Sequence, residues 1–283
     1  MNNHITRAIA LAGVALIFSV RSYSEASQGA AQSVQPDAAN PTAIDKMKLP
    51  SGYMPRAQLP DSLLLLPPPP RPGSAAMKAD EQARAAAMKL RGSARYRLAS
   101  EDAVIGFPEI PNDFACSVGF AISKETTPRL YGLMAKMLID VGLSTYKAKD
   151  YYKRSRPFVV HHTSTCYPKD DALLRHDGSY PSGHSALGWG YALVLAELDP
   201  SHADAILTRG RDFGQSRLVC GAHWQSDIDE GRVIAAATVA RLHADSGFRE
   251  DLEAARAEVI GALQQGKTPV RDCATEASAL TAR

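Results

Sequence analysis

The spacing of apolar residues between Pro128 and Lys153 constrains the fold of this chain more than any other feature of its sequence. Apolar side chains recur there at intervals of three and four residues, at Leu130, Leu133, Met134, Met137, Leu138 and Val141. Such intervals place the side chains on one face of an α-helix. The segment is therefore predicted to be helical, with one buried face.

Similar helical patterns cover residues 75–90, 185–198, 203–213 and 227–243, and residues 250–265 are expected to form a charged terminal helix. No run of alternating apolar and polar residues is long enough to predict a β-sheet. The chain has 283 residues, of which 45% are apolar, and this suffices for a sizeable core. We expect residues 51–279 to form a single all-α domain, folded as a helical bundle.

Residues 1–26 have the layout of a secretory signal peptide. Arg7 is followed by a 13-residue apolar run from Ala8 to Val20, and small residues flank Glu25. At about 1.5 Å per helical residue the run is shorter than the hydrocarbon core of a bilayer, so a retained membrane anchor is the less favoured alternative. We expect a periplasmic protein without stable membrane insertion, whose residues 27–50 are mobile because they are polar and rich in Ala and Pro.

Four leucines at 63–66 directly precede four prolines at 67–70. Consecutive prolines favour an extended polyproline II segment, and leucines are usually covered from solvent. We expect this segment to pack its leucines against the side of the domain. The alternative is a motif that binds a partner.

The cysteines are also consistent with export from the cytoplasm. Cys116, Cys166, Cys220 and Cys273 are an even number, and in an exported chain they predict two disulfides. Three pairings are possible, and the spacing does not choose among them. One or two unpaired, buried thiols are the alternative. No C-x-x-C pair is present, so a zinc site is not expected.

The charges of the chain nearly cancel, with 32 Lys and Arg against 30 Asp and Glu. Proteins that bind nucleic acid usually carry a basic surface, so no nucleic-acid partner is expected. Attraction for an anionic ligand must therefore come from a few cations placed close together. Three short motifs contain such cations.

The first motif contains Lys149 and Arg156, followed by Pro157. Seven residues along a helix bring two side chains to nearly the same side, two turns apart. Because Pro157 disfavours helical backbone at Arg156, we expect the helix to end there with both cations on one face. Two such cations can hold different oxygens of one phosphate. Taken alone, the motif is more simply a solvated basic face that includes Lys153 and Arg154.

The second motif runs from Gly178 to His184 and precedes an apolar helical segment. Ser182 is a good residue to cap that helix, and Gly183 lets the backbone approach a ligand closely. Free N–H groups at a helix N-terminus form an anion site, where His184 would exchange a proton. The plainer alternative is an ordinary capped helix start with an incidental histidine.

The third motif contains Arg217, His223 and Asp227. His223 and Asp227 are four residues apart, so on a helix they would share a face. A carboxylate bonded to one imidazole nitrogen leaves the other nitrogen free to attack an electrophile. The alternatives are a surface His–Asp pair beside a structural arginine, or a metal site, which would leave the three cations unexplained.

Together the motifs supply two histidines, three cations and one carboxylate, a set that suits phosphoryl transfer without a metal. The segment between Pro157 and Pro181 holds further polar residues, at His161, His162, Asp170, Asp171, His176 and Asp177. We interpret this segment as a solvated loop at the rim of the site rather than as a metal cluster.

The three motifs match the signature K-x6-RP, PSGH and SR-x5-H-x3-D, and the chain therefore resembles the type-2 phosphatidic-acid-phosphatase/haloperoxidase superfamily. The element GSYPSGH at 178–184 is similar to that of the secreted bacterial class A non-specific acid phosphatases. The resemblance covers roughly residues 60–245. Ser185 stands where that family is expected to have Thr, and both residues carry a hydroxyl.

The resemblance implies a helical bundle of the superfamily's kind, a homodimer, and an acid phosphatase that needs no metal or other cofactor. It implies that His223 is the nucleophile and forms a phosphohistidine, that Asp227 orients it, and that His184 is the general acid. The phosphoryl oxygens would be held by Lys149, Arg156, Ser182, Gly183 and Arg217. Small-molecule phosphate monoesters would be the substrates, and inorganic phosphate or vanadate would bind the same site.

Four alternatives use the same residues. A vanadium-dependent haloperoxidase would hold vanadate on these cations, but the GSYPSGH element favours the phosphatase. Phosphotransferase or diphosphohydrolase activity on the same site is also compatible with the motifs. A lipid-phosphate phosphatase would need transmembrane helices, which the sequence after residue 20 lacks. A non-enzymatic phosphate binder would be expected to have lost a catalytic position.

Overall fold

The computed structural model describes residues 51–266 and 268–281, which contain helices and no β-strand. The all-α prediction is confirmed. The predicted signal peptide (1–26) and mobile segment (27–50) lie outside the described residues, and the domain limits 51–279 stay a prediction. The α-helices are α1 (Ser62–Leu65), α2 (Ala75–Met88), α3 (Ala94–Glu101), α4 (Glu109–Asn112), α5 (Ala115–Val118), α6 (Pro128–Ser144), α7 (Tyr146–Tyr152), α8 (Pro157–Val160), α9 (Asp171–Leu174), α10 (Gly183–Leu198), α11 (Ala203–Val219), α12 (Gln225–Leu242), α13 (Ser246–Gln264) and α14 (Cys273–Thr281).

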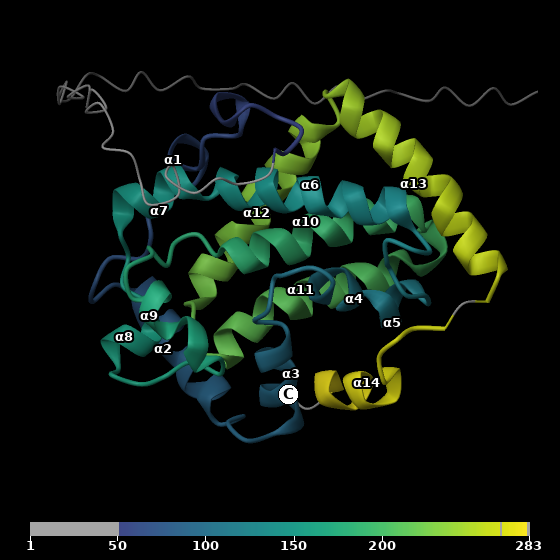
Figure 1. The fold of residues 1–283 in the computed structure, drawn as a ribbon. Coiled ribbons are helices and arrows are strands. Elements are labelled where there is room, and N and C mark those ends of the chain that lie inside the picture. Colours follow the sequence, from purple (N-terminus) through teal and green to yellow (C-terminus); the bar gives the residue numbers. More distant parts are fainter. Residues whose placement is uncertain (1–50, 267, 282–283) are drawn as a thin grey trace, which may run out of the picture. The chain divides into compact units, whose positions relative to one another are not determined.

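Helix α10 lies at the centre of the core. It packs against α6, α11 and α12, and in Figure 1 it runs between α6 and α11. Most of its residues are small or apolar, so it is buried on nearly every side rather than along one stripe. Because Gly183 is its first residue, the start of the most enclosed helix lies at the second motif.

The apolar stripe predicted over 128–153 is divided between two helices. Helix α6 ends at Ser144 and α7 begins at Tyr146, with Thr145 between them. The hydroxyl of Thr145 donates to the carbonyl of Gly142 at 2.7 Å. A hydroxyl that bonds nearby backbone in this way competes with regular helix hydrogen bonding, which accounts for the break at this residue.

The leucine-rich segment differs from its prediction. Residues Ser62–Leu65 form a helical turn, and the side chain of Asp61 accepts hydrogen bonds from two N–H groups at its start. The buried side of this turn carries Ser62 and Leu66, whereas Leu64 is 85% exposed and Leu65 is 48% exposed. The prediction that all four leucines pack against the domain was therefore wrong. A single helical turn directs consecutive side chains to different sides.

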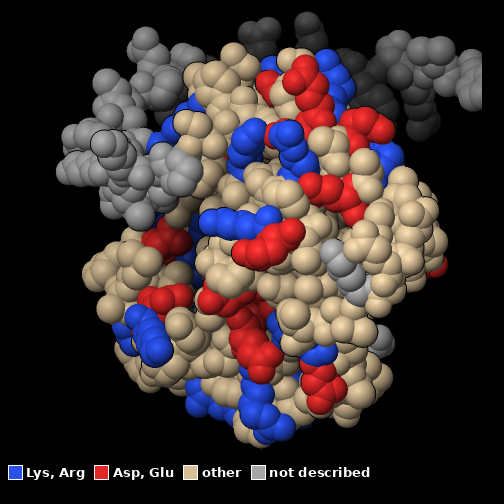
Figure 2. Space-filling model, turned by 45° about the vertical axis from the view of Figure 1, so that its right-hand side comes forward, with Lys and Arg blue, Asp and Glu red and all other residues tan. Residues whose placement is uncertain are grey.

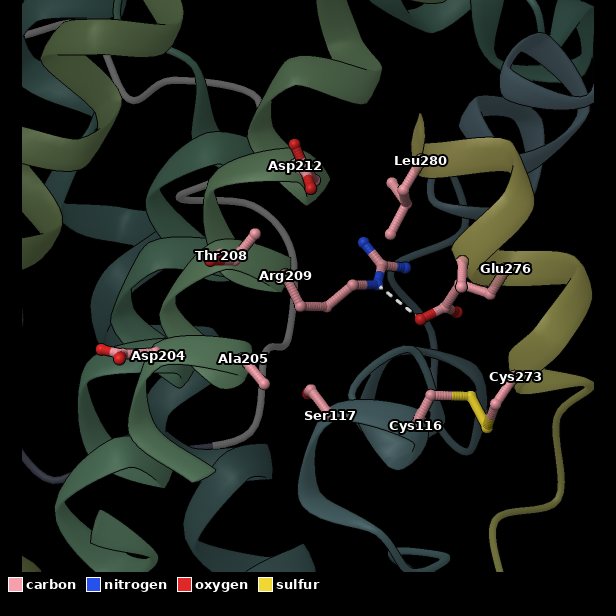
Figure 3. A pocket seen from close by; sticks show the side chains of 11 residues that line it. Cys116, Ser117, Asp204, Ala205, Thr208, Arg209, Asp212, Cys273, Glu276 and Leu280 are labelled. Carbon is pink, nitrogen blue, oxygen red and sulfur yellow. Dashed lines mark ion pairs between the residues drawn. A yellow bond between two sulfur atoms is a disulfide. The ribbon is translucent and has the colours of Figure 1, made fainter. Parts of the chain in front are cut away.

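Two disulfides are present, as the cysteine count predicted, and they select one of the three pairings. Cys116 pairs with Cys273, and Cys166 pairs with Cys220. The first bond joins α5 to the start of α14, beside a cavity of about 440 Å³. Figure 3 shows this cavity, across which Arg209 of α11 forms an ion pair with Glu276 of α14. None of the residues that line it belongs to the three motifs.

The surface carries both signs of charge. On the face shown in Figure 2, basic and acidic side chains are interspersed among uncharged ones, as the near-zero net charge suggests. Among residues 51–266 and 268–281, no helix is both long enough and apolar enough to cross a bilayer.

Helices α10 and α11 approach each other closely at Gly210. A Cβ atom at this position would lie 2.3 Å from the Cβ of Ala192 and 2.8 Å from the carbonyl oxygen of Gly188, both on α10. Atoms do not approach so closely without displacement, so only glycine allows this helix spacing.

We therefore expect Gly210→Ala to separate α10 from α11 and to destabilise the protein by about 1–3 kcal/mol. Gly261 of α13 is a matched control, because a Cβ there meets no heavy atom within 4 Å. Gly261→Ala should stabilise its helix by up to about 1 kcal/mol. Denaturant unfolding measures both free energies, and equal effects of the two substitutions would contradict this packing argument.

Candidate active site

The structure brings the three motifs together around His223. Lys149 lies on α7, Arg156 directly precedes α8, and Arg217 lies near the end of α11. Ser182, Gly183 and His184 form the start of α10. The charges of all three cations act on the His223 ring, and the charge of Arg217 also acts on His184.

His223 is buried, and its two ring nitrogens have different partners. Nε2 lies 2.8 Å from Nη1 of Arg156. Because arginine only donates, Nε2 must accept and the proton of the neutral ring is on Nδ1. Nδ1 lies 3.3 Å from the hydroxyl of Ser179 and 3.4 Å from Oδ2 of Asp227. The lone pair therefore lies on the side of the cations.

His223 and Asp227 meet by a different route from the one predicted. His223 lies before α12, whose N-cap is Trp224, so the two residues do not share a helix face. Instead, Oδ2 of Asp227, in the first turn, turns back and accepts from the N–H of Trp224 at 2.9 Å. This capping bond holds the carboxylate at the helix start, next to the histidine that precedes it.

Ser179 and Arg154 complete the surroundings of Asp227. The Ser179 hydroxyl donates to Oδ2 at 2.5 Å, and Nη1 of Arg154 donates to Oδ1 at 2.5 Å. Because the Ser179 hydroxyl donates to Asp227, it can accept from Nδ1 of His223. Sequence reasoning missed Ser179 as a site residue, although it belongs to the GSYPSGH element.

Arg154 is not part of a solvated basic face. Its side chain is only 9% exposed, and its guanidinium also pairs with Asp80 of α2 at 2.7 Å. Asp80 in turn accepts from the N–H and the hydroxyl of Ser226. The sequence held no signal for Asp80, because α2 is remote in the chain and reaches the site only through the fold. Lys153, by contrast, is exposed, as the plainer interpretation of the first motif required.

Lys149 and Arg156 are close, but they are not on one helix. Helix α7 ends at Tyr152, and Lys153 adopts the left-handed conformation with φ 43°. The chain then turns, and Arg156 precedes the short helix α8. The prediction of one helix face was therefore wrong, because the helix ends four residues before Arg156.

The segment before Pro181 is not a solvated loop throughout. Oδ2 of Asp177 lies 2.6 Å from Nη2 of Arg156 and 3.3 Å from Nζ of Lys149. The next residue, Gly178, has its carbonyl 2.5 Å from the same Nζ. A Cβ atom at Gly178 would lie 2.5 Å from the carbonyl oxygen of Lys149, so glycine is required for this close contact.

Two other polar residues of that segment have structural partners. Asp171 is buried and accepts from the hydroxyl of Thr165 at 2.6 Å. His161 lies 3.1 Å from the carboxylate of Glu81. Among the described residues, no three His, Cys, Asp or Glu side chains are grouped so that they could hold a metal ion.

The start of α10 has the predicted cap. The Ser182 hydroxyl accepts from the N–H of Ser185 at 3.2 Å, and the Ser182 N–H donates to the carbonyl of Asp227 at 2.8 Å. His184 is partly exposed, and its Nε2 donates to the carbonyl of Ala103 at 3.0 Å. Nδ1 of His184 is therefore the nitrogen left to exchange a proton.

Arg217 differs from the other cations in its partners. It is 1% exposed, yet it forms no ion pair with any described residue, and its Nε has no hydrogen-bond partner there. Burial, together with the charge of Arg156, lowers the pKa of Arg217 to about 9. A buried guanidinium without a carboxylate is costly unless an anion joins it.

Burial also shifts the other ionisable groups of the site. It lowers the pKa of Lys149 to about 8, so this ammonium group stays charged in acid and at neutrality. Burial and the adjacent cations lower the pKa of His223 well below its usual range, and burial with Arg217 does the same for His184. Both imidazoles are therefore neutral in the empty site.

The Arg154 contacts lead to a prediction for stability. Arg154→Gln leaves the buried carboxylates of Asp80 and Asp227 without their shared cation, and should destabilise the protein by about 3–5 kcal/mol. Lys153→Gln removes the same charge from the exposed neighbouring residue and should change stability by less than about 0.5 kcal/mol. Thermal and denaturant unfolding would measure the difference. A loss of similar size in both variants would contradict the role given to Arg154.

Comparison with known proteins agrees with this geometry. Residues 129–250 match the PAP2 superfamily. The chain is 42% identical over 207 residues to the non-specific acid phosphatase of Providencia stuartii, covering 73% of this chain and 84% of that protein. It is 42% identical over 209 residues to an acid phosphatase of Zymomonas mobilis, covering 74% and 79%, and 42% identical over 200 residues to the non-specific acid phosphatase of Salmonella typhimurium, covering 70% and 80%. The chain therefore belongs to the PAP2 superfamily, which its three motifs indicated, and within it to the class A non-specific acid phosphatases, which the GSYPSGH element indicated.

Proposed function

We propose that this protein is an exported acid phosphatase that hydrolyses a broad range of phosphate monoesters through a phosphohistidine at His223. The observation that carries the proposal is the buried guanidinium of Arg217, which has no ion-pair partner within residues 51–266 and 268–281 and lies beside two neutral imidazoles. An anion with several oxygens, such as a phosphoryl group, would bond this guanidinium and compensate its charge.

In the first step, Nε2 of His223 attacks phosphorus and the bond to the ester oxygen breaks. The phosphoryl group is then covalently bound to His223, and the leaving alkoxide takes a proton from Nδ1 of His184, which gains that proton from solvent when the phosphoryl anion enters the site and offsets the charge of Arg217. The Nδ1 proton of His223 faces Ser179 and Asp227, whose carboxylate stabilises the positive charge that develops on the ring. Because burial keeps His223 neutral, Nε2 keeps its lone pair even in acid, and the lone pair becomes free to attack when Arg156 turns its N–H group to the phosphoryl oxygens.

In the second step, water attacks phosphorus and the bond to Nε2 breaks. His184, now neutral, takes a proton from this water, and inorganic phosphate is released. The transition state of each step spreads negative charge over three oxygens. Lys149, Arg156 and Arg217 would bind these oxygens, joined by the N–H of Gly183 and the hydroxyl of Ser182.

The proposal includes independence from metal ions, export to the periplasm and assembly as a homodimer. Independence from metal ions rests on the side chains of the site, which supply the cationic, nucleophilic and acid groups that the reaction needs. Export rests on the pattern of residues 1–26, and the homodimer on the family resemblance. Inorganic phosphate and vanadate would compete with substrate for the same cations.

His223→Ala tests the nucleophile. It should lower kcat for p-nitrophenyl phosphate by about 10⁴-fold or more, because no other group can form the covalent intermediate. The wild-type protein should keep its activity in EDTA. His202→Ala, at an exposed histidine, is the control and should retain full turnover. Full activity in His223→Ala would overturn the mechanism.

His184→Ala tests the general acid through the leaving group. For alkyl phosphates it should lower kcat/KM, which reports the step that forms the phosphohistidine, by about 10²–10⁴-fold, because an alkoxide leaves poorly without a proton. For p-nitrophenyl phosphate the loss should be much smaller, since p-nitrophenolate is stable unprotonated. Steady-state kinetics across a series of leaving groups would measure this difference. An equal loss of kcat/KM for every substrate would assign His184 to phosphate binding instead.

A further inference from the structure

The carboxylate of Asp177 occupies cations that the proposed mechanism gives to the substrate. Oδ2 forms ion pairs with both Arg156 and Lys149, whose side chains are only 2% and 4% exposed. The Asp177 side chain is 25% exposed, so it lies between the buried cations and solvent. A phosphoryl oxygen that approached the same N–H groups would meet this carboxylate.

The carboxylate is not needed to hold the cations in place. Nε of Arg156 donates to the backbone carbonyl of Asp177 at 3.0 Å, and Nη1 donates to the carbonyl of Ala222 at 3.2 Å. Nζ of Lys149 donates to the carbonyl of Gly178 at 2.5 Å. These contacts involve backbone oxygens, which a substitution of the Asp177 side chain leaves in place.

Asp177 also changes the charge that a substrate meets. Three cations act on the His223 ring, namely Lys149, Arg156 and Arg217, and a fourth, Arg154, pairs with Asp227 beside it. The carboxylates that form ion pairs with these four cations are Asp80, Asp177 and Asp227. With both imidazoles neutral, the cluster therefore carries one net positive charge. Without the carboxylate of Asp177 it would carry two, which would complement a dianion.

We propose that Asp177 is a specificity-determining residue, which competes with the phosphoryl group for Lys149 and Arg156 and thereby favours monoanionic over dianionic phosphate. The inference rests on the proposed function, because it takes these two cations as the phosphate site. This preference makes the enzyme bind its ligand better at acid pH, where phosphate is a monoanion. A fixed negative charge repels a dianion about twice as strongly as a monoanion at the same distance.

The pH range in which Asp177 repels the ligand follows from the ionisable groups around Asp177. Burial alone would raise its pKa, but Lys149 and Arg156 hold the pKa below its usual range. The other titratable groups that interact with it are Tyr146 and Asp150 of α7. Asp177 is thus ionised from mild acid upward, whereas phosphate monoesters lose their second proton at about pH 6. Repulsion by Asp177 therefore increases when the ligand becomes a dianion.

Asp177→Asn is the direct test, because it removes the charge and keeps the size. Calorimetric titration with inorganic phosphate should show a Kd about tenfold lower than wild type at about pH 7.5, and about threefold lower at about pH 5. The profile of kcat/KM should extend to higher pH, through a lower KM. Asp150→Asn is the matched control, since it removes an exposed carboxylate of α7 that forms no ion pair with either cation, and its Kd should change less than about twofold.

Three results would overturn the inference: weaker phosphate binding in Asp177→Asn, an equal gain at both pH values, or an equal gain in Asp150→Asn. Asp177→Ser, which also lacks the charge, must show the same tightening, and circular dichroism verifies that each variant is folded. Calorimetry needs no turnover, so these results do not depend on the phosphohistidine step. If His223→Ala kept full activity while Asp177→Asn bound phosphate more tightly, the mechanism would fail and this inference would stand.

Discussion

The burial of four cationic side chains around His223 and Asp227 is the constraint on which the rest of this site depends. Removing such groups from water is costly unless carboxylates and hydrogen bonds replace the solvent. Asp227 and Asp80 compensate Arg154, and Asp177 bridges Lys149 and Arg156, but Arg217 has no carboxylate partner among the described residues. The site is therefore suited to an anion, and the same desolvation keeps His223 neutral.

The helical bundle makes this arrangement rigid. The start of α10 is tied to the start of α12 by the bond from the Ser182 N–H to the Asp227 carbonyl. Helix α10 is enclosed by its neighbours and approaches α11 so closely that Gly210 cannot carry a side chain. The start of α10, with His184, is thus positioned by backbone packing in the core, whereas Lys149 and Arg156 are held by backbone carbonyl oxygens.

Much of the fold could be predicted because its helices have strong local signals. The patterns at 75–90, 185–198 and 227–243 correspond to α2, α10 and α12 within a few residues. Predictions failed where a helix ended without an apolar signal. Thr145 divides the stripe of α6 from α7, and the left-handed turn at Lys153 separates Lys149 from Arg156. In each case hydrogen bonding or backbone conformation outweighed the periodicity, and periodicity alone contains no information about either.

The sequence by itself determined the fold class, the presence of two disulfides, and the residue types of the site, because these depend on composition and on spacing within short motifs. The tertiary structure alone decided which cysteines pair and that Asp80 and Ser179 support Asp227. It also decided that Asp177 contacts two of the cations, although the sequence suggested a solvated loop. The physical reason is that a buried charge takes its partners from whatever segment the fold brings near, and α2, the turn at 177–179 and α12 are far apart in the chain.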